Sequence, residues 1–188
     1  LKHNVGLLKQ CKMRLHLDLI AGLPKEDLQS FYNSFDEIYR LKPDILQLGF
    51  LKMLYGSKIR READLFHYIY RKEPPYEVLK NDSISFPELM RLKDMEEAVE
   101  IYHNSRSFVT ALNYVFDENE IRPSAFFDAL GQALKGEGRL SFKEQFALIG
   151  SMITSKKTEG RFPAALPTLS PSRRRKLFSN CWIMRRLF

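Results

Sequence analysis

Residues 14–51 carry the pattern that most restricts what this chain can fold into. Leucines alternate with other residues over 14–21, which is typical of a β-strand. A Gly-Leu-Pro turn ends this strand, because glycine tolerates unusual backbone angles and proline cannot extend a ladder. An apolar stripe at helical spacing predicts a helix over 26–41, and a second strand is predicted over 45–51. A connection of this length favours a right-handed crossover between two parallel strands.

The two predicted strands each have one apolar face and one mixed face. Alternation places His16 and Asp18 on one face of the first strand, and Gln47 and Gly49 on one face of the second. The apolar faces should lie under the crossover helix, so the polar residues should share the opposite side. Ligands in such sheets bind at the carboxyl ends of the strands, here residues 21–26 and 52–57.

The rest of the chain is predicted to be helical. Pro74 and Pro75 form a stiff linker over 72–76, where a domain boundary is expected and beyond which no strand signal remains. Ser85 with Glu88, and Ser141 with Glu144, have the spacing of capping boxes. Helices are predicted over 58–67, 85–103, 107–116, 123–136 and 141–153.

The predicted fold class is therefore α/β plus all-α, as part of a (β/α) barrel with parallel strands followed by a small helical bundle. We expect three parts: residues 1–73 as the barrel part, 74–154 as the helical domain, and 155–188 as a basic, disordered tail.

The formal charge of +7 is concentrated at one end of the chain. Nine basic residues and one acid lie from Lys156 onward, so the preceding 155 residues carry 21 basic and 22 acidic side chains. A nucleic-acid footprint over the whole fold is therefore excluded, and nucleic acid could bind only through the tail. The tail is either an arm for a polyanion or a solvated terminus, and altered coding at the end of a gene fragment is a third possibility.

Cys11 and Cys181 are the only cysteines, which excludes a disulfide framework and a CxxC metal site. The chain contains no run of about 18 apolar residues and no signal-peptide pattern, so we expect a cytoplasmic protein with no membrane partner. The sequence also lacks the Gly-x-Ser-x-Gly elbow, the phosphate loop, the dinucleotide fingerprint and His-Glu-x-x-His.

Several motifs resemble the radical SAM enzymes, particularly those that also carry a cobalamin-binding domain. The segment LHLDLIAGLPKE, at 15–26, closely resembles their fifth-strand motif. LQLGFLK at 46–52, with Gly56 and Ser57, resembles the sixth strand and the turn behind it. PPYEVL at 74–79 and the helices after it resemble an uncharacterised helical domain appended to one group of these proteins.

The resemblance implies a six-stranded partial barrel that binds S-adenosylmethionine beside a four-iron four-sulfur cluster, with cobalamin in the full-length relative. The implied cofactor-binding residues are Ile20 and Gly22 for the adenosyl part, and Leu51, Lys52 and Leu54 along the adenine. The implied substrate-facing residues are His16, Asp18 and Gln47. Each has a plain alternative: Asp18 could anchor a loop, His16 could be an interior histidine, Gly22 could serve the turn alone and Lys52 could be solvated.

The chain departs from this family at the cluster, because the three cysteines at C-x3-C-x2-C spacing that leave one iron open are absent. We therefore expect a carboxyl-terminal fragment that has no catalytic residues or metal ligands of its own and binds no cofactor alone. Its partner would be the missing amino-terminal cobalamin- and cluster-binding portion, and its substrate is unknown. The alternative is a helical interaction module whose basic tail binds nucleic acid or an acidic partner.

Overall fold

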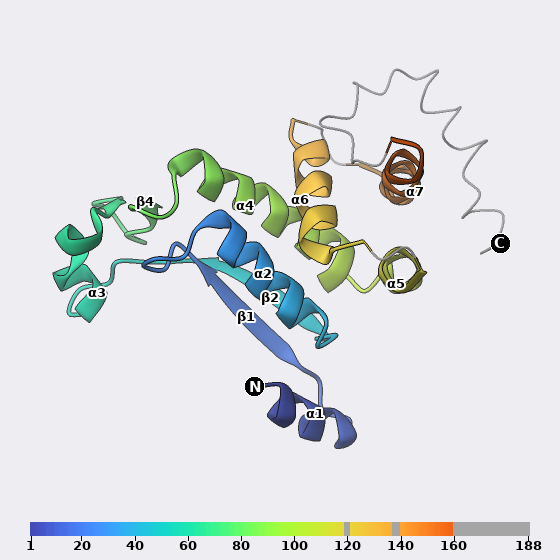
Figure 1. Cartoon of the computed structure of the whole chain (residues 1–188), viewed down its shortest axis with the longest axis horizontal. Coiled ribbons are helices and arrows are strands. Elements are labelled where there is room, and N and C mark those ends of the chain that lie inside the picture. Colours follow the sequence, from blue (N-terminus) through green and yellow to red (C-terminus); the bar gives the residue numbers. More distant parts are fainter. Residues whose placement is uncertain (119–120, 137–139, 160–188) are drawn as a thin grey trace.

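The computed structural model describes residues 1–118, 121–136 and 140–159 (Figure 1). It begins with a helix that the sequence did not predict, α1 (Lys2–Gln10), which precedes the first strand. The Lys2 side chain lies 3.5 Å from the Glu37 carboxylate. Only Val5 of α1 is buried, whereas Leu7 and Leu8 are exposed. The sequence analysis did not predict α1 because this helix has no wide stripe of apolar residues that would be buried.

The predicted parallel pair is confirmed. Strands β1 (His16–Ala21) and β2 (Ile45–Phe50) are parallel and in register, from His16 opposite Ile45 to Ala21 opposite Phe50. Helix α2 (Leu28–Tyr39) connects them, and its first turn is capped by Asp27, whose carboxylate accepts a hydrogen bond from the Ser30 amide at 2.7 Å. Phe31 and Phe35 of α2 are fully buried.

The predicted helix over 58–67 is wrong in its length. Ser57 does cap a helix, but α3 (Lys58–Arg61) ends after four residues and a 3₁₀ turn, η1 (Ala63–Phe66), follows. Among these residues only Ala63 is buried. A short helix without a buried stripe gains little from tertiary packing, so the segment does not continue as one helix.

The expectation that strand signals end at the proline linker is also wrong. Strand β4 (Val78–Lys80) lies beyond the linker and pairs antiparallel with β3 (Ile69–Tyr70). Strands of three and two residues are too short for alternation to reveal them. An isolated bridge between Lys52 and Glu77 ties the linker region back to the end of β2.

The predicted helices of the carboxyl-terminal half are confirmed in order and approximate extent. Helix α4 (Phe86–Val99) continues as a π-helix, η2 (Glu100–Asn104), and is followed by α5 (Val109–Glu118), α6 (Pro123–Leu134) and α7 (Phe142–Glu159). Both predicted capping boxes form. Helix α7 extends past 153, so residues 155–159 of the expected tail are helical, while 160–188 lie outside the described residues.

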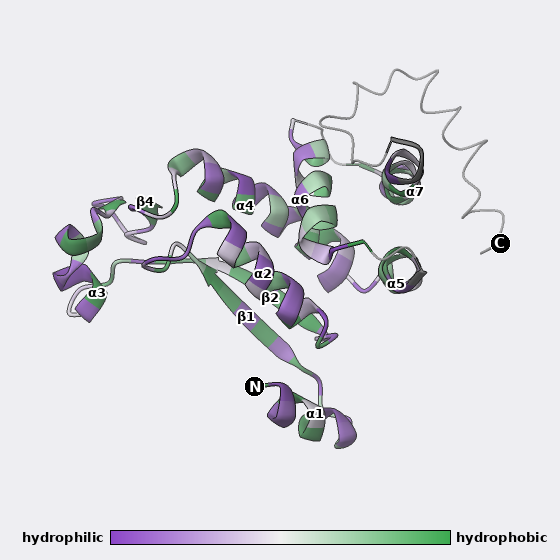
Figure 2. Cartoon of the chain, in the orientation of Figure 1, coloured by the Kyte–Doolittle hydropathy of each residue, from purple (hydrophilic) through white to green (hydrophobic). Residues whose placement is uncertain are grey.

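These helices do not form an up-and-down bundle. In Figure 1, α5 and α7 are seen end-on while α6 lies across the view, so neighbouring helices cross steeply. The closest crossing is between α4 and α6 at Gly131, where an added Cβ would lie 2.4 Å from the Asp94 carbonyl oxygen. Only glycine lets the two backbones approach this closely. Figure 2 shows α6 largely hydrophobic in colour, in keeping with its nine buried residues.

One hydrophobic core runs through the described residues on both sides of the linker. It includes Phe35 of α2, Leu46 of β2, Tyr102 of η2 and Phe127 of α6, each 0 % exposed. The boundary expected at 72–76 therefore does not separate two cores, and the division into domains stays a prediction. The described strands form two sheets of two strands each, without a closed barrel.

Candidate functional site

The open face of the β1–β2 sheet holds the three predicted substrate-facing residues, and the fold brings them into contact. The Nε2 atom of His16 lies 3.0 Å from the Asp18 carboxylate and 3.2 Å from the Gln47 side-chain oxygen. The side chains of His16 and Asp18 are 52 % and 66 % exposed. His16 is therefore not an interior histidine. It joins the two strands through polar contacts on a solvent-facing surface.

The opposite face of the same sheet is closed. Leu46 and Leu48 are buried in the core with Phe31 and Phe35 of α2. The division into one apolar and one polar face is therefore as alternation predicted. A sheet with one face packed and a polar, uncovered face of this kind can present groups to a ligand.

The outer edge of β2 is closed by a side chain. Asn104, at the end of η2, accepts a hydrogen bond from the Leu46 amide at 3.0 Å and donates one to the Leu46 carbonyl at 3.0 Å. The side-chain amide thus takes the place of a neighbouring strand. On the outer side of β1, in contrast, no strand among the described residues pairs with the sheet.

Apolar side chains are exposed at the carboxyl ends of both strands. Ile20 is 47 % exposed at the end of β1, and Leu54 and Tyr55 are 54 % and 73 % exposed after β2. Lys52 is also exposed. The side chains of Ile20 and Leu54 are therefore accessible to solvent, and their role in binding a cofactor stays a prediction.

Gly22 and Leu51, two other predicted cofactor residues, are committed to the chain's own structure. Gly22 has a φ of +90°, and its carbonyl accepts hydrogen bonds from the Tyr68 hydroxyl at 2.9 Å and from the Asn81 amide at 3.2 Å. The Leu51 amide donates to Ala21 at 3.0 Å, and its carbonyl accepts from Val78 at 2.9 Å. These carbonyls are thus engaged within the protein, and a cofactor role for the two residues stays a prediction.

The residues present do not fit an iron–sulfur cluster. Cluster binding needs several thiolates in one place, whereas Cys11 is exposed in isolation and Cys181 lies outside the described residues. Within the described part of the chain, no three His, Cys, Asp or Glu side chains gather as a metal site would require.

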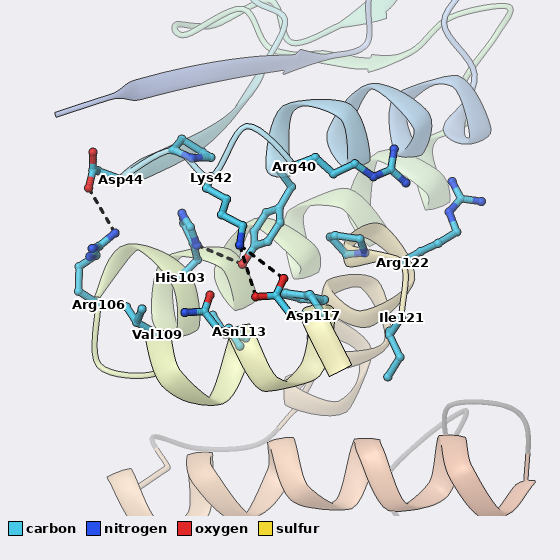
Figure 3. Close-up of a pocket in the computed structure, with 15 residues that line it drawn as sticks. Arg40, Lys42, Asp44, His103, Arg106, Val109, Asn113, Asp117, Ile121 and Arg122 are labelled. Carbon is cyan, nitrogen blue, oxygen red and sulfur yellow. Dashed lines mark hydrogen bonds and ion pairs between the residues drawn. The ribbon is translucent and has the colours of Figure 1, made fainter. Parts of the chain in front are cut away.

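Sequence reasoning missed a cavity on the other side of α2 (Figure 3). It encloses about 470 Å³ and lies between the end of α2, the loop before β2, η2 and α5. Tyr39, His103 and Asp117 are among its lining residues. These residues are far apart in the sequence and share no motif, so no sequence signal could have grouped them.

Part of the chain matches a known family model. Residues 64–148 match the family described as "Protein of unknown function (DUF4080)". This DUF4080 domain starts inside η1 and extends into α7, so it contains the β3–β4 hairpin and α4 to α6 but neither strand of the parallel pair. No curated protein matches the chain. None of the described helices has both the length and the apolar character needed to cross a bilayer.

Proposed function

We propose that this chain supplies the last part of a barrel wall in a radical SAM enzyme, with the DUF4080 domain packed behind it. The observation that carries the proposal is the parallel β1–β2 pair, whose polar face is uncovered while its other face is buried. The resemblance of 15–26 and 46–52 to the fifth- and sixth-strand motifs supports the same assignment.

The proposed roles follow from what each side chain can reach. Ile20 and Leu54 form an apolar wall for the adenosyl part of S-adenosylmethionine, since both are exposed at the carboxyl ends of the sheet. His16, Asp18 and Gln47 face the substrate side. Because His16 contacts both Asp18 and Gln47, its ring is held in one orientation. In this orientation the ring can donate a hydrogen bond to a substrate or accept one from it.

The cluster and cobalamin belong to a segment outside these 188 residues in this proposal. The cluster would supply the electron that cleaves S-adenosylmethionine, and no step through it is assigned to residues of this chain. The open outer side of β1 is where a preceding strand would pair, since β2 is already closed by Asn104. The other reading, a helical module with a nucleic-acid-binding tail, depends on residues outside the described ones.

The test begins with the coding sequence on both sides of this chain. A segment with C-x3-C-x2-C should be found, and the joined protein should release 5′-deoxyadenosine from S-adenosylmethionine after anaerobic reconstitution with iron and sulfide. Ile20→Glu and Leu54→Glu should each weaken S-adenosylmethionine binding by roughly tenfold or more, because a carboxylate would be buried against the adenosyl group.

Leu7→Glu is the matched control, since Leu7 is 50 % exposed on α1 at the far end of β1. It should leave binding unchanged. The proposal is wrong if the flanking sequence holds no cluster motif, or if the joined protein does not cleave S-adenosylmethionine. If all three glutamate variants change S-adenosylmethionine binding equally, Ile20 and Leu54 do not form the proposed apolar wall.

A further inference from the structure

The cavity beside α2 is separate from the site proposed above. Its lining includes Pro43 and Asp44, which precede β2, whereas the proposed cofactor residues lie at or beyond the carboxyl ends of the strands. At about 470 Å³ it is within the range of small-molecule sites, roughly 300–1,000 Å³. The cavity and the open sheet face therefore offer two different surfaces to ligands.

His103 and Tyr39 line the cavity and contact each other. His103 Nδ1 lies 3.2 Å from the Tyr39 hydroxyl, and the two rings are 5.1 Å apart. The other ring nitrogen, Nε2, is buried and has no hydrogen-bond partner among the described residues. Because Nε2 is buried, a ligand in the cavity meets the rest of the His103 ring and not this nitrogen.

Among the described lining residues, basic side chains outnumber acidic ones. The charged lining residues are Arg40, Lys42, Arg106, Arg122, Asp44 and Asp117. Figure 3 shows Arg106 at one end of the cavity, paired with Asp44, while Lys42 points toward Asp117 near the middle.

The ion pairs among the described residues account for all but one of the basic lining side chains. Arg106 lies 3.5 Å from Asp44, and Lys42 lies 3.4 Å from Asp117. Arg122 is engaged outside the lining, where its Nε donates to Asp36 at 2.7 Å. Arg40 makes no ion pair or side-chain hydrogen bond within the described part of the chain, and it is exposed. The described lining residues thus carry a positive charge that their own carboxylates do not neutralise.

The remaining walls are apolar and aromatic. Leu112 and Phe116 of α5 line the cavity together with Tyr39. The rings of Tyr39 and Phe116 meet edge to face, with centroids 5.1 Å apart. A ligand that fills this space therefore needs a flat or apolar body as well as a charged group.

We propose that this cavity binds a small organic anion, with an aromatic or apolar body against Tyr39 and Phe116 and a phosphate or carboxylate group held by Arg40. Two kinds of charged group fit this description, because guanidinium groups bind phosphate and carboxylate with the same geometry.

Nuclear magnetic resonance of the full chain tests the proposal with phenyl phosphate as the probe. Phenyl phosphate should produce saturable shifts in the ring resonances of His103, Tyr39 and Phe116. Benzoate should shift the same resonances if carboxylates are also accepted. Inorganic phosphate should bind more weakly than phenyl phosphate, and benzylamine, which has the same ring and the opposite charge, should not saturate.

Arg40→Gln should weaken phenyl phosphate binding by roughly tenfold, since it removes a hydrogen bond to a charged group. Arg71→Gln is the matched control, because Arg71 is exposed and does not line the cavity. Absence of saturable shifts, equal affinity for benzylamine, or unchanged affinity in Arg40→Gln would each overturn the proposal, whether or not the chain belongs to a radical SAM enzyme.

Discussion

Asn104 forms with Leu46 the pair of hydrogen bonds that a neighbouring strand would form, one to the amide and one from the carbonyl, each 3.0 Å long. The same side chain donates to Glu100 at 2.7 Å. Both bonds to Leu46 lie at the edge of β2 that β1 does not use. The π-helical turn η2 thus ends the sheet on that side and joins it to the helical half of the molecule.

Replacing Asn104 by aspartate should destabilise the protein by about 1–3 kcal/mol. The carboxylate cannot donate to the Leu46 carbonyl, and it would lie beside Glu100. Urea denaturation measures the loss. Asn4→Asp, at an exposed position of α1, is the control and should change the free energy of unfolding by less than about 0.5 kcal/mol. Similar losses in both variants would mean that Asn104 does not hold the sheet edge.

Gly131→Ala should be among the most damaging single substitutions in the helical half. The new methyl group would lie 2.4 Å from the Asp94 carbonyl oxygen and 2.7 Å from the Met95 amide nitrogen, so α4 and α6 would have to separate. We expect a loss of at least about 2 kcal/mol in the free energy of unfolding.

The control for that substitution is Gly6→Ala in α1, where nothing lies within 4 Å of the added carbon. Alanine is the better helix former by up to about 1 kcal/mol, so this variant should be neutral or slightly more stable. Thermal unfolding of both variants by circular dichroism makes the comparison. Equal stability of the two would contradict the close approach of α4 and α6.

Buried Tyr102 and half-buried Tyr32 should respond in opposite ways to loss of the hydroxyl group. The Tyr102 side chain is 0 % exposed and its hydroxyl has no partner among the described residues, so Tyr102→Phe should be neutral or stabilising. The Tyr32 hydroxyl donates to Asp128 at 2.7 Å, so Tyr32→Phe should cost about 1 kcal/mol. Urea denaturation of the two variants should therefore rank Tyr102→Phe above Tyr32→Phe, and the reverse order would show that the Tyr102 hydroxyl is satisfied.

His103 should make stability fall on the acid side of neutrality. Burial lowers its pKa below 6.5, and Arg106 acts in the same direction, while the Pro43 carbonyl and Asp44 oppose the shift. As pH falls through about 6.5, His103 becomes protonated in the unfolded chain but stays neutral in the folded chain. The free energy of unfolding therefore decreases. The decrease should end once the folded pKa is passed.

Urea denaturation at a series of pH values measures this effect. His103→Phe should remove the part of the decline that begins near pH 6.5, whereas His3→Phe, at an exposed position on α1, should retain it. A profile that is the same in wild type and in His103→Phe would show that another group carries the pH dependence.

Hydrogen exchange should be slower in α6 than in β1. Helix α6 has nine buried residues, while β1 has one face in solvent and an outer side to which no described strand pairs. Slower exchange in the strand pair than in the helical half would contradict this expectation and would indicate that the sheet is protected by contacts beyond those described.

Local sequence patterns were sufficient for the elements whose causes are local. The alternation over 14–21 and 45–51 correctly predicted two parallel strands with His16 and Gln47 on the same face. Ser85 and Glu88 correctly predicted the start of α4, because a capping box needs only residues three positions apart.

Elements stabilised by distant residues were missed or misjudged. The β3–β4 hairpin is too short to alternate, and the single helix expected over 58–67 ends early because only Ala63 is buried there. Tyr68 and Asn81 donate hydrogen bonds to the Gly22 carbonyl. The fifth-strand motif does not predict these bonds, because the two donors lie 46 and 59 residues away in the sequence.

The sequence by itself determined the parallel strand pair with its connecting helix, the order of α4 to α7, the polar face of the sheet and the lack of a C-x3-C-x2-C triplet. Alternation, capping and composition are properties of neighbouring residues or of the whole chain. Only the tertiary structure decided that Asn104 bonds to the outer edge of β2 at Leu46, that one core runs across the proline linker, and that His103 Nε2 is buried. Each of these depends on contacts between residues far apart in the sequence, whose positions are fixed only when the helices pack.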